Sequence, residues 1–183
     1  MLKYILLGFL NYGSLSGYDL KSLMDGSTMH FWHAYHSQIY TTLRKLEDDG
    51  FVVSEVLEDD EGRMNRRLYS LTEKGRADLQ AWLGEPMMER SAVKEDLLVR
   101  VFFSARRDRQ QVLDELRIQR QLHLQKLEYY RSLSPGHLIA EVEGAEVMHE
   151  DAVFWSATLD FGLAYERMYL EWLDRTIAQI ESL

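Results

Sequence analysis

The chain has 183 residues, of which 46% are hydrophobic and 28% are charged, a composition typical of a folded globular protein with one domain or two small ones. It contains no cysteine, which excludes disulfide bonds and thiolate metal sites and fits a reducing compartment. The net charge of -9 argues at first sight against a nucleic-acid partner, so the distribution of the charges matters more than their sum.

An apolar stretch opens the chain and predicts a helix over residues 2–12, closed by Gly13. Residues 2–10 are too few to span a membrane. They carry one lysine, and no small-residue cleavage site follows them, so a secretory signal is not indicated. We therefore expect the first core helix of a cytoplasmic protein that has no membrane segment.

A second helix is predicted to begin at Ser16. Asp19 follows three residues later, which is the spacing of a capping box, in which the two side chains cap the helix start reciprocally. Leu20, Leu23 and Met24 continue this helix at core spacing, and it is expected to end near Gly26.

A third helix is predicted from His36 to about Asp49, ended by Gly50. Its apolar stripe is narrow, because only Ile39, Leu43 and Leu46 recur at helical spacing. The opposite face is polar and holds no acid between residues 37 and 45; it carries Ser37, Gln38, Tyr40, Thr41, Arg44 and Lys45. Such a mixture of hydroxyls, an amide and cations indicates a surface that contacts a partner.

A β-hairpin and a fourth helix follow. Residues 51–58 and 66–71 are predicted strands, and residues 59–62 are the predicted turn between them. Thr72 is expected to cap a helix that runs to about Leu83. The charges are segregated here: residues 47–61 hold eight acids and no base, whereas residues 62–76 hold five bases and one acid.

Three helices, a hairpin and a further helix are the order of a winged helix-turn-helix domain. In that fold the third helix enters the major groove of DNA, where it meets base edges and phosphates. Arg63, Arg66 and Arg67 lie at or near the hairpin turn, where phosphates or the minor groove would be. The predicted partner is therefore double-stranded DNA.

The second half predicts a helical domain. Glu85-Pro86 is the expected boundary, which divides the chain into residues 1–84 and 85–183. Helices are predicted over residues 93–103, 108–133 and about 150–182. A helix of more than 30 residues needs a second long helix to cover its apolar stripe, and a second copy of the chain is the commonest source. The expected fold is thus mainly α with a small β-hairpin, in a homodimer formed through the C-terminal helices.

Several separated segments resemble the PadR family of bacterial transcriptional regulators, in its PadR and AphA-like branch. They are LKYILLGFL, LSGYDL, FWHAYHSQIYTTLRKLEDDGFV, GRMNRRLYSLTEKGR, VKEDLLVRVFF and WSATLDFGLAYERMYLEWL. The resemblance implies a homodimeric winged-helix repressor, less often an activator. A dimer would place two recognition helices on a palindromic operator. The residues expected to bind DNA are then Ser37, Gln38, Tyr40, Thr41, Arg44, Lys45, Arg63, Asn65, Arg66 and Arg67. Met64 stands where the family usually has proline.

The resemblance also implies an effector, because this branch of the family includes sensors of phenolic acids. Two groups of aromatic residues are candidates for a site that would bind a small aromatic or apolar molecule. They lie around the second helix and on the last helix, and the expected lining residues are Tyr18, Trp32, Phe154, Trp155, Phe161 and Tyr165.

Other interpretations are open. His30, His33 and His36 are spaced by three residues and are the residue type that most often binds Zn²⁺ or Ni²⁺, so a metal-responsive regulator is one alternative. A winged helix that contacts only proteins, through the acidic run, is another. The chain has no G-x-S-x-G, G-x-G-x-x-G or P-loop motif, so neither an enzyme nor a cofactor is expected.

Overall fold

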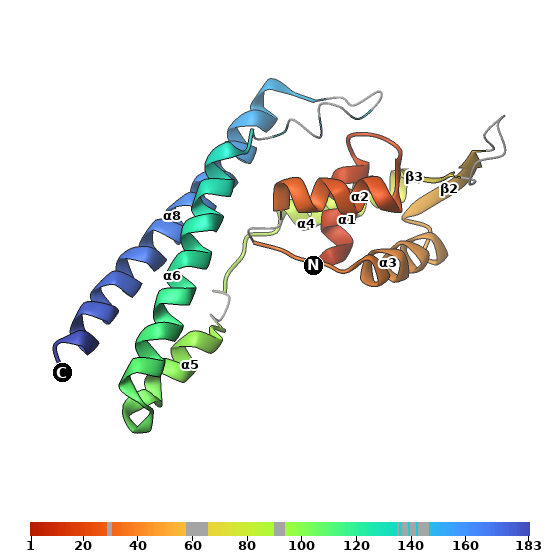
Figure 1. Ribbon diagram of the computed structural model, residues 1–183. Helices are drawn as coiled ribbons and strands as arrows, with labels where there is room; N and C mark the ends of the chain where they lie inside the picture. Colours follow the sequence, from red (N-terminus) through yellow and green to blue (C-terminus); the bar gives the residue numbers. More distant parts are fainter. Residues whose placement is uncertain are drawn as a thin grey trace. The chain divides into compact units, whose positions relative to one another are not determined.

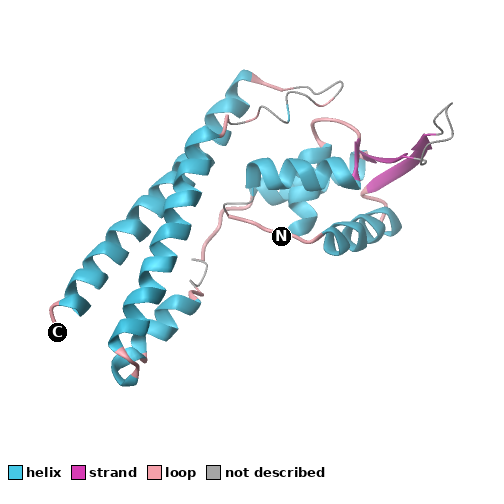
Figure 2. Ribbon diagram, in the orientation of Figure 1, coloured by secondary structure: helices cyan, strands magenta, loops and turns pink. Residues whose placement is uncertain are grey.

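The computed structural model is mainly helical with one small antiparallel sheet, as predicted (Figures 1 and 2). It describes residues 1–28, 31–57, 66–89, 94–134, 136, 139, 142 and 147–183. The chain forms two compact units: Met1–Pro86 with Ser134–Ser156, and Met87–Leu133 with Ala157–Leu183. Residues 134–156 thus group with the first unit, and the division into domains 1–84 and 85–183 stays a prediction.

The first unit has the element order of a winged helix. Its elements are α1 (Leu2–Leu10), β1 (Leu15–Ser16), α2 (Gly17–Leu23), a π-helical turn (Met24–Thr28), α3 (His36–Asp48), β2 (Val52–Leu57), β3 (Arg66–Leu71) and α4 (Glu73–Gly84). Their common core includes Leu6, Leu7, Leu20, Ile39 and Leu43, which are all fully buried. Burial of these side chains is the main favourable term that holds the three helices and the sheet together.

The sheet has a third strand that the sequence pattern did not predict. β3 pairs on one side with β2, from Val52 opposite Leu71 to Leu57 opposite Arg66, and on the other side with the two residues of β1. Leu15 lies opposite Tyr69. A two-residue strand is too short to display an alternating pattern, and its pairing partner lies more than fifty residues away. The predicted turn at residues 59–62 lies outside the described residues.

The predicted helix boundaries around α3 are confirmed. Gly50 has φ +75, a left-handed conformation that glycine adopts without steric cost. Its N–H donates to the Glu47 carbonyl, and the Phe51 N–H donates to the Leu46 carbonyl, which is the hydrogen-bond pattern of a Schellman motif. The chain therefore leaves α3 sharply and enters β2 directly, which fixes the start of the hairpin beside the helix.

The second unit is a bundle of α5 (Asp96–Phe102), a 3₁₀ turn (Ser104–Arg106), α6 (Arg109–Ser132) and most of α8 (His149–Glu181). α6 and α8 lie side by side (Figure 1). They are antiparallel, because Arg120 bonds to Asp174 at 2.5 Å while Arg117 bonds to Glu181 at 2.7 Å. A core that includes Leu113, Leu116 and Leu173 joins the two helices.

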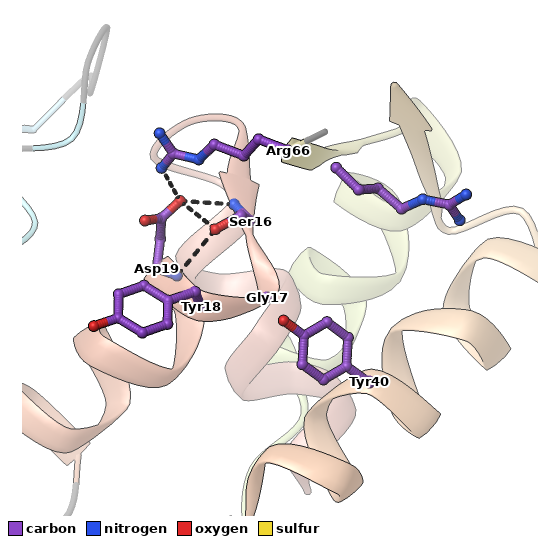
Figure 3. A pocket seen from close by; sticks show the side chains of 7 residues that line it. Ser16, Gly17, Tyr18, Asp19, Tyr40 and Arg66 are labelled. Carbon is purple, nitrogen blue, oxygen red and sulfur yellow. Dashed lines mark hydrogen bonds and ion pairs between the residues drawn. The ribbon is translucent and has the colours of Figure 1, made fainter. Parts of the chain in front are cut away.

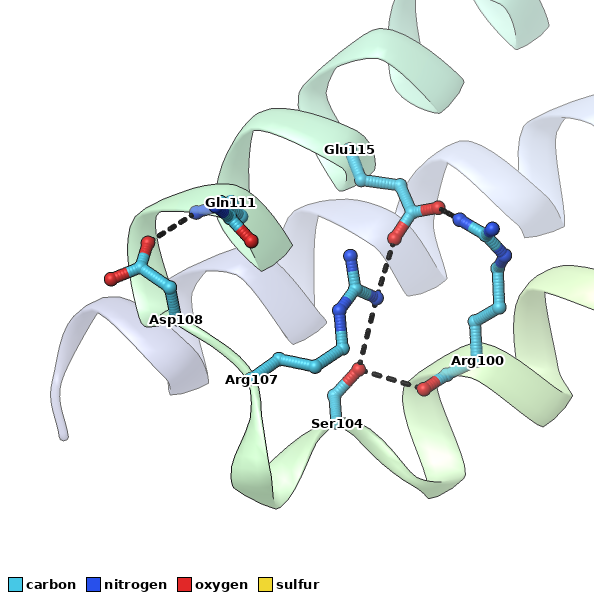
Figure 4. A network of polar contacts seen from close by, with 6 residues as sticks. All are labelled: Arg100, Ser104, Arg107, Asp108, Gln111 and Glu115. Atoms are coloured by element: carbon cyan, nitrogen blue, oxygen red, sulfur yellow. Dashed lines mark hydrogen bonds and ion pairs between the residues drawn. The ribbon is translucent and has the colours of Figure 1, made fainter.

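A polar network closes the corner between α5 and α6 (Figure 4). Glu115 accepts hydrogen bonds from Arg100 and from Arg107, the latter at 2.7 Å. Asp108 caps α6 by accepting from the Gln111 N–H at 2.9 Å. The two guanidiniums hold the pKa of the Glu115 carboxyl below its usual value. The network is exposed to solvent, so it orients the turn and adds little stability.

Among the described residues, none of the helices is both long enough and apolar enough to cross a membrane.

Candidate nucleic-acid interface

α3 has a buried apolar stripe on one side and an exposed polar face on the other. Ile39, Leu43 and Leu46 are at most 2% exposed, as the spacing predicts. The polar residues predicted to bind DNA from this helix are all exposed: Ser37, Gln38, Tyr40, Thr41, Arg44 and Lys45. The stripe therefore fixes the helix in the first unit and leaves the opposite face accessible.

One of these polar side chains also caps the helix. The Oε1 atom of Gln38 accepts a hydrogen bond from the Tyr35 N–H at 2.9 Å. Such a bond satisfies one of the backbone donors that a helix start leaves without an intrahelical partner. The carbonyl of this amide thus stabilises the start of α3, a role that sequence spacing alone did not suggest.

Tyr40 packs against the start of α2. A Cβ atom on Gly17 would lie 2.5 Å from Cε1 of the Tyr40 ring, which is far inside van der Waals contact. Any larger residue at position 17 would push the ring aside. The missing side chain of Gly17 therefore leaves room for the Tyr40 ring, which remains 48% exposed.

The two described arginines of the wing are ion-paired. Here the wing means β2, β3 and the segment between them. Arg66 Nη2 lies 2.5 Å from Asp19 Oδ2 on α2, and Arg67 Nη1 lies 3.8 Å from Glu47 Oε2 on α3. These pairs connect the start of β3 to both helices. The predicted contact residues Arg63 and Asn65, and Met64 beside them, lie outside the described residues.

Asp19 caps the start of α2 and also pairs with Arg66. Its Oδ2 atom accepts from the Ser16 N–H at 2.9 Å, and the Asp19 N–H donates to Ser16 Oγ at 3.2 Å, which confirms the predicted capping box. Burial raises the pKa of the Asp19 carboxyl, but hydrogen bonds from Ser16 and Arg66 outweigh it, and the net shift is downward. The carboxylate is therefore charged at neutral pH and keeps Arg66 beside α2.

The residues predicted to line an effector site are distributed over both units. In the first unit, Trp32 and Trp155 pack against the core, whereas Tyr18 and Phe154 are 71% and 69% exposed. In the second unit, Phe161 is 62% exposed, and Tyr165 packs against the core with its hydroxyl 3.5 Å from Glu95 Oε2. The effector site stays a prediction.

Trp155 belongs to a polar and aromatic cluster that the sequence pattern did not reveal. Its ring meets the Tyr12 ring edge-on at a centroid distance of 5.7 Å, and the Tyr12 hydroxyl donates to Asp151 Oδ1 at 3.1 Å. Burial and the Asp151 charge raise the pKa of Tyr12 to about 12. These contacts attach the first turns of α8 to α1 and the residues after it.

The histidine cluster is only partly described. His33 and His36 are exposed, and His30 lies outside the described residues. Within the described part of the chain, no group of three or more potential metal-binding side chains comes together.

Both halves of the chain match known protein families. Residues 6–81 match the transcriptional regulator PadR-like family, and residues 93–181 match the virulence activator alpha C-term family. A protein of Bacillus subtilis (strain 168), the negative transcriptional regulator PadR, is 32% identical over 181 residues, which cover 99% of this chain and 98% of that protein.

Two crystal structures of Bacillus subtilis PadR are also similar. The structure in complex with operator DNA has a TM-score of 0.81 and 29% identity, and the match covers 98% of each chain. The structure in complex with p-coumaric acid has a TM-score of 0.71 and 30% identity, and the match covers 98% of this chain and 95% of that one. The present chain therefore belongs to the PadR-like family of transcriptional regulators.

Proposed function

We propose that the protein is a homodimeric repressor that binds a palindromic operator through α3 and the wing and that a small aromatic molecule releases it from DNA. The observation that carries the DNA-binding part is the exposed face of residues 37–45 in α3, which presents six polar side chains and no acid opposite a fully buried stripe. The complex of the similar Bacillus subtilis PadR with operator DNA supports it.

The chemistry of this face suits the major groove. The Arg44 guanidinium can donate two hydrogen bonds to the O6 and N7 atoms of a guanine, and the Thr41 side chain offers a hydroxyl and a methyl group to base edges. Arg66 and Arg67 at the start of β3 suit phosphates, which fix the register of the protein on the duplex. Recognition of sequence would then come from α3 and general affinity from the wing.

Substitution on α3 tests this assignment. Arg44→Ala and Thr41→Val are each expected to weaken binding to the operator by about 1–3 kcal/mol, while binding to a scrambled duplex changes less. Fluorescence anisotropy with labelled duplexes at fixed salt measures both affinities. Arg76→Gln on α4 is the matched control, because it removes one positive charge at a side chain that bonds to Asn11.

Equal losses on operator and scrambled duplex would contradict a base-reading role for α3. A wild-type protein that binds no duplex at low salt would contradict the proposed function as a whole and would favour a winged helix that contacts only proteins.

Assembly through the second unit is suggested by apolar side chains that this unit leaves exposed. On α6 and α8 they include Ile118, Leu122, Phe161 and Met168, which are between 50% and 62% exposed. Exposed apolar surface on long helices is typical of a protein interface. A two-fold symmetric dimer would cover it and would supply two recognition helices for the two halves of a palindrome.

The proposed effector is a small planar aromatic acid. The similar Bacillus subtilis PadR has been crystallised with p-coumaric acid, and the present chain carries several aromatic side chains in its first unit and on α8. Release of DNA requires that the effector bind the DNA-free conformation more tightly than the DNA-bound one, since equal affinity would shift nothing.

Sedimentation of a fluorescent operator duplex with the protein tests assembly and release together. We expect two chains per duplex, and we expect p-coumaric acid to return the duplex to the sedimentation coefficient of free DNA. One chain per duplex would refute the dimer. Unchanged sedimentation across p-coumaric acid and a panel of related phenolic acids would refute the aromatic effector.

A further inference from the structure

A groove lies where the start of α2, the middle of α3 and the start of β3 meet (Figure 3). We call it the tyrosine–arginine groove. Its lining residues are Ser16, Gly17, Tyr18, Asp19, Tyr40, Arg66 and Arg67. Tyr18 is 71% exposed and Tyr40 is 48% exposed, so both phenol rings are accessible from solvent.

The polar groups of the groove are mainly hydrogen-bond donors. Two phenolic hydroxyls and two guanidiniums line it, against one carboxylate, that of Asp19. This carboxylate already accepts from the Ser16 N–H, the Ser16 hydroxyl and Arg66. A ligand with several acceptor oxygens and a negative charge therefore fits the groove, and a phosphate group has this chemistry.

The location favours a phosphate of the DNA backbone over a free phosphate. Tyr40 belongs both to the groove and to the exposed polar face of α3. A duplex whose major groove receives α3 would carry its backbone along the edges of that helix. Tyr18 and Tyr40 are both exposed beside the groove, as contact with a continuous strand requires.

Asp19 gives Arg66 a defined position in the groove. The bond between Arg66 Nη2 and Asp19 Oδ2 is 2.5 Å long, and a guanidinium has five N–H donors. Donors that face away from Asp19 remain for a second acceptor. Asp19 is thus a positioning residue for Arg66, because the capping box fixes its carboxylate at the start of α2.

We propose that the tyrosine–arginine groove binds one phosphodiester of the operator backbone, with the Tyr18 hydroxyl as a hydrogen-bond donor and Arg66 as the neutralising cation. The proposal rests on the proposed DNA-binding function and assigns Tyr18 to the DNA interface, a residue that the sequence pattern assigned to an effector site.

The two side chains should differ in their salt dependence. Tyr18→Phe removes a neutral donor, so affinity is expected to fall about tenfold on operator and scrambled duplex alike while the slope of log K against log salt stays unchanged. Arg66→Gln removes a counterion-releasing cation, so the slope is expected to fall by about one. Tyr129→Phe in the second unit is the matched control, because Tyr129 is an exposed tyrosine on α6.

Methylphosphonate substitution identifies the contacted phosphate. We expect a single neutralised phosphate per half-site at which Tyr18→Phe causes no further loss of affinity, because the contact has already been removed from the DNA side. An unchanged affinity of Tyr18→Phe, or effects that add at every phosphate tested, would overturn the proposal. Inorganic phosphate that binds at Tyr18 without competing with the duplex would overturn the backbone assignment.

These outcomes are separate from a failure of the proposed function. If the wild type prefers the operator and Arg44→Ala abolishes that preference while Tyr18→Phe has no effect, only the groove assignment is wrong. If the wild type binds neither duplex, the proposed function itself is wrong.

Discussion

Gly75→Ala is expected to lower the free energy of unfolding of the first unit by about 3 kcal/mol, since overpacking against a rigid neighbour has costs of this order. Gly75 lies in the first turn of α4 and is buried. A Cβ atom at this position would lie 2.1 Å from the carbonyl oxygen of Phe51. The obstacle is a backbone atom, so a side-chain rotation cannot relieve the clash.

The neighbouring hydrogen bonds prevent the Phe51 carbonyl from moving away. It accepts from the Thr72 N–H at 3.1 Å and from Thr72 Oγ1 at 3.0 Å. Thr72 Oγ1 also accepts from the Gly75 N–H at 3.1 Å, which caps α4. A shift large enough to admit the methyl group would break the junction between β2, β3 and α4.

Urea denaturation monitored by circular dichroism measures the effect. Gly8→Ala is the matched control: nothing lies within 4 Å of its added Cβ. Because Gly8 lies within α1, that variant is expected to gain roughly 0.5–1 kcal/mol from helix propensity. Equal urea midpoints for the two variants would show that the junction tolerates the methyl group. The close approach of Gly75 to the Phe51 carbonyl would then not require glycine.

The sequence predicted those features that depend on local spacing. The buried stripe of α3, the capping box of Ser16 and Asp19, and the left-handed Gly50 each follow from residues within one or two helical turns. Long α6 and α8 were predicted for the same reason, because apolar residues recur at helical intervals over their whole length. The family resemblance added the expected function of these elements.

Contacts between residues far apart in the chain could not be predicted in this way. Arg66 and Asp19 are 47 positions apart, and their ion pair exists because β3 pairs with β1 directly before α2. The close approach of Tyr40 to Gly17 has the same origin. Glu47 of the acidic run pairs with Arg67, and Asp19 pairs with Arg66, and neither pair follows from local spacing.

A hydrogen-bonded pair of Glu166 and His123 in the second unit was likewise absent from the sequence-based predictions. Glu166 on α8 is 5% exposed, and its Oε2 lies 2.5 Å from Nδ1 of His123 on α6. The imidazole stacks on the Tyr169 ring at a centroid distance of 3.8 Å and an interplanar angle of 15°.

Two tyrosines near this pair have raised pKa values. Burial, together with the charges of Glu166 and Tyr129, raises the pKa of Tyr130 to about 12. Burial and the charges of Glu95 and Glu166 also raise the pKa of Tyr165. These hydroxyls therefore remain protonated at neutral pH.

His123→Leu is expected to lower the free energy of unfolding of the second unit by about 3–5 kcal/mol at neutral pH, because it leaves a buried carboxylate without its partner. The double variant His123→Leu with Glu166→Leu should recover most of that loss, since apolar residues of similar size can replace a buried ion pair at little cost. Urea denaturation of the wild type, both single variants and the double variant, at one fixed protein concentration, gives the coupling energy of the pair. If the loss in the double variant equals the sum of the two single losses, His123 and Glu166 stabilise the packing of α6 and α8 independently. The interaction between the two side chains would then contribute nothing of its own.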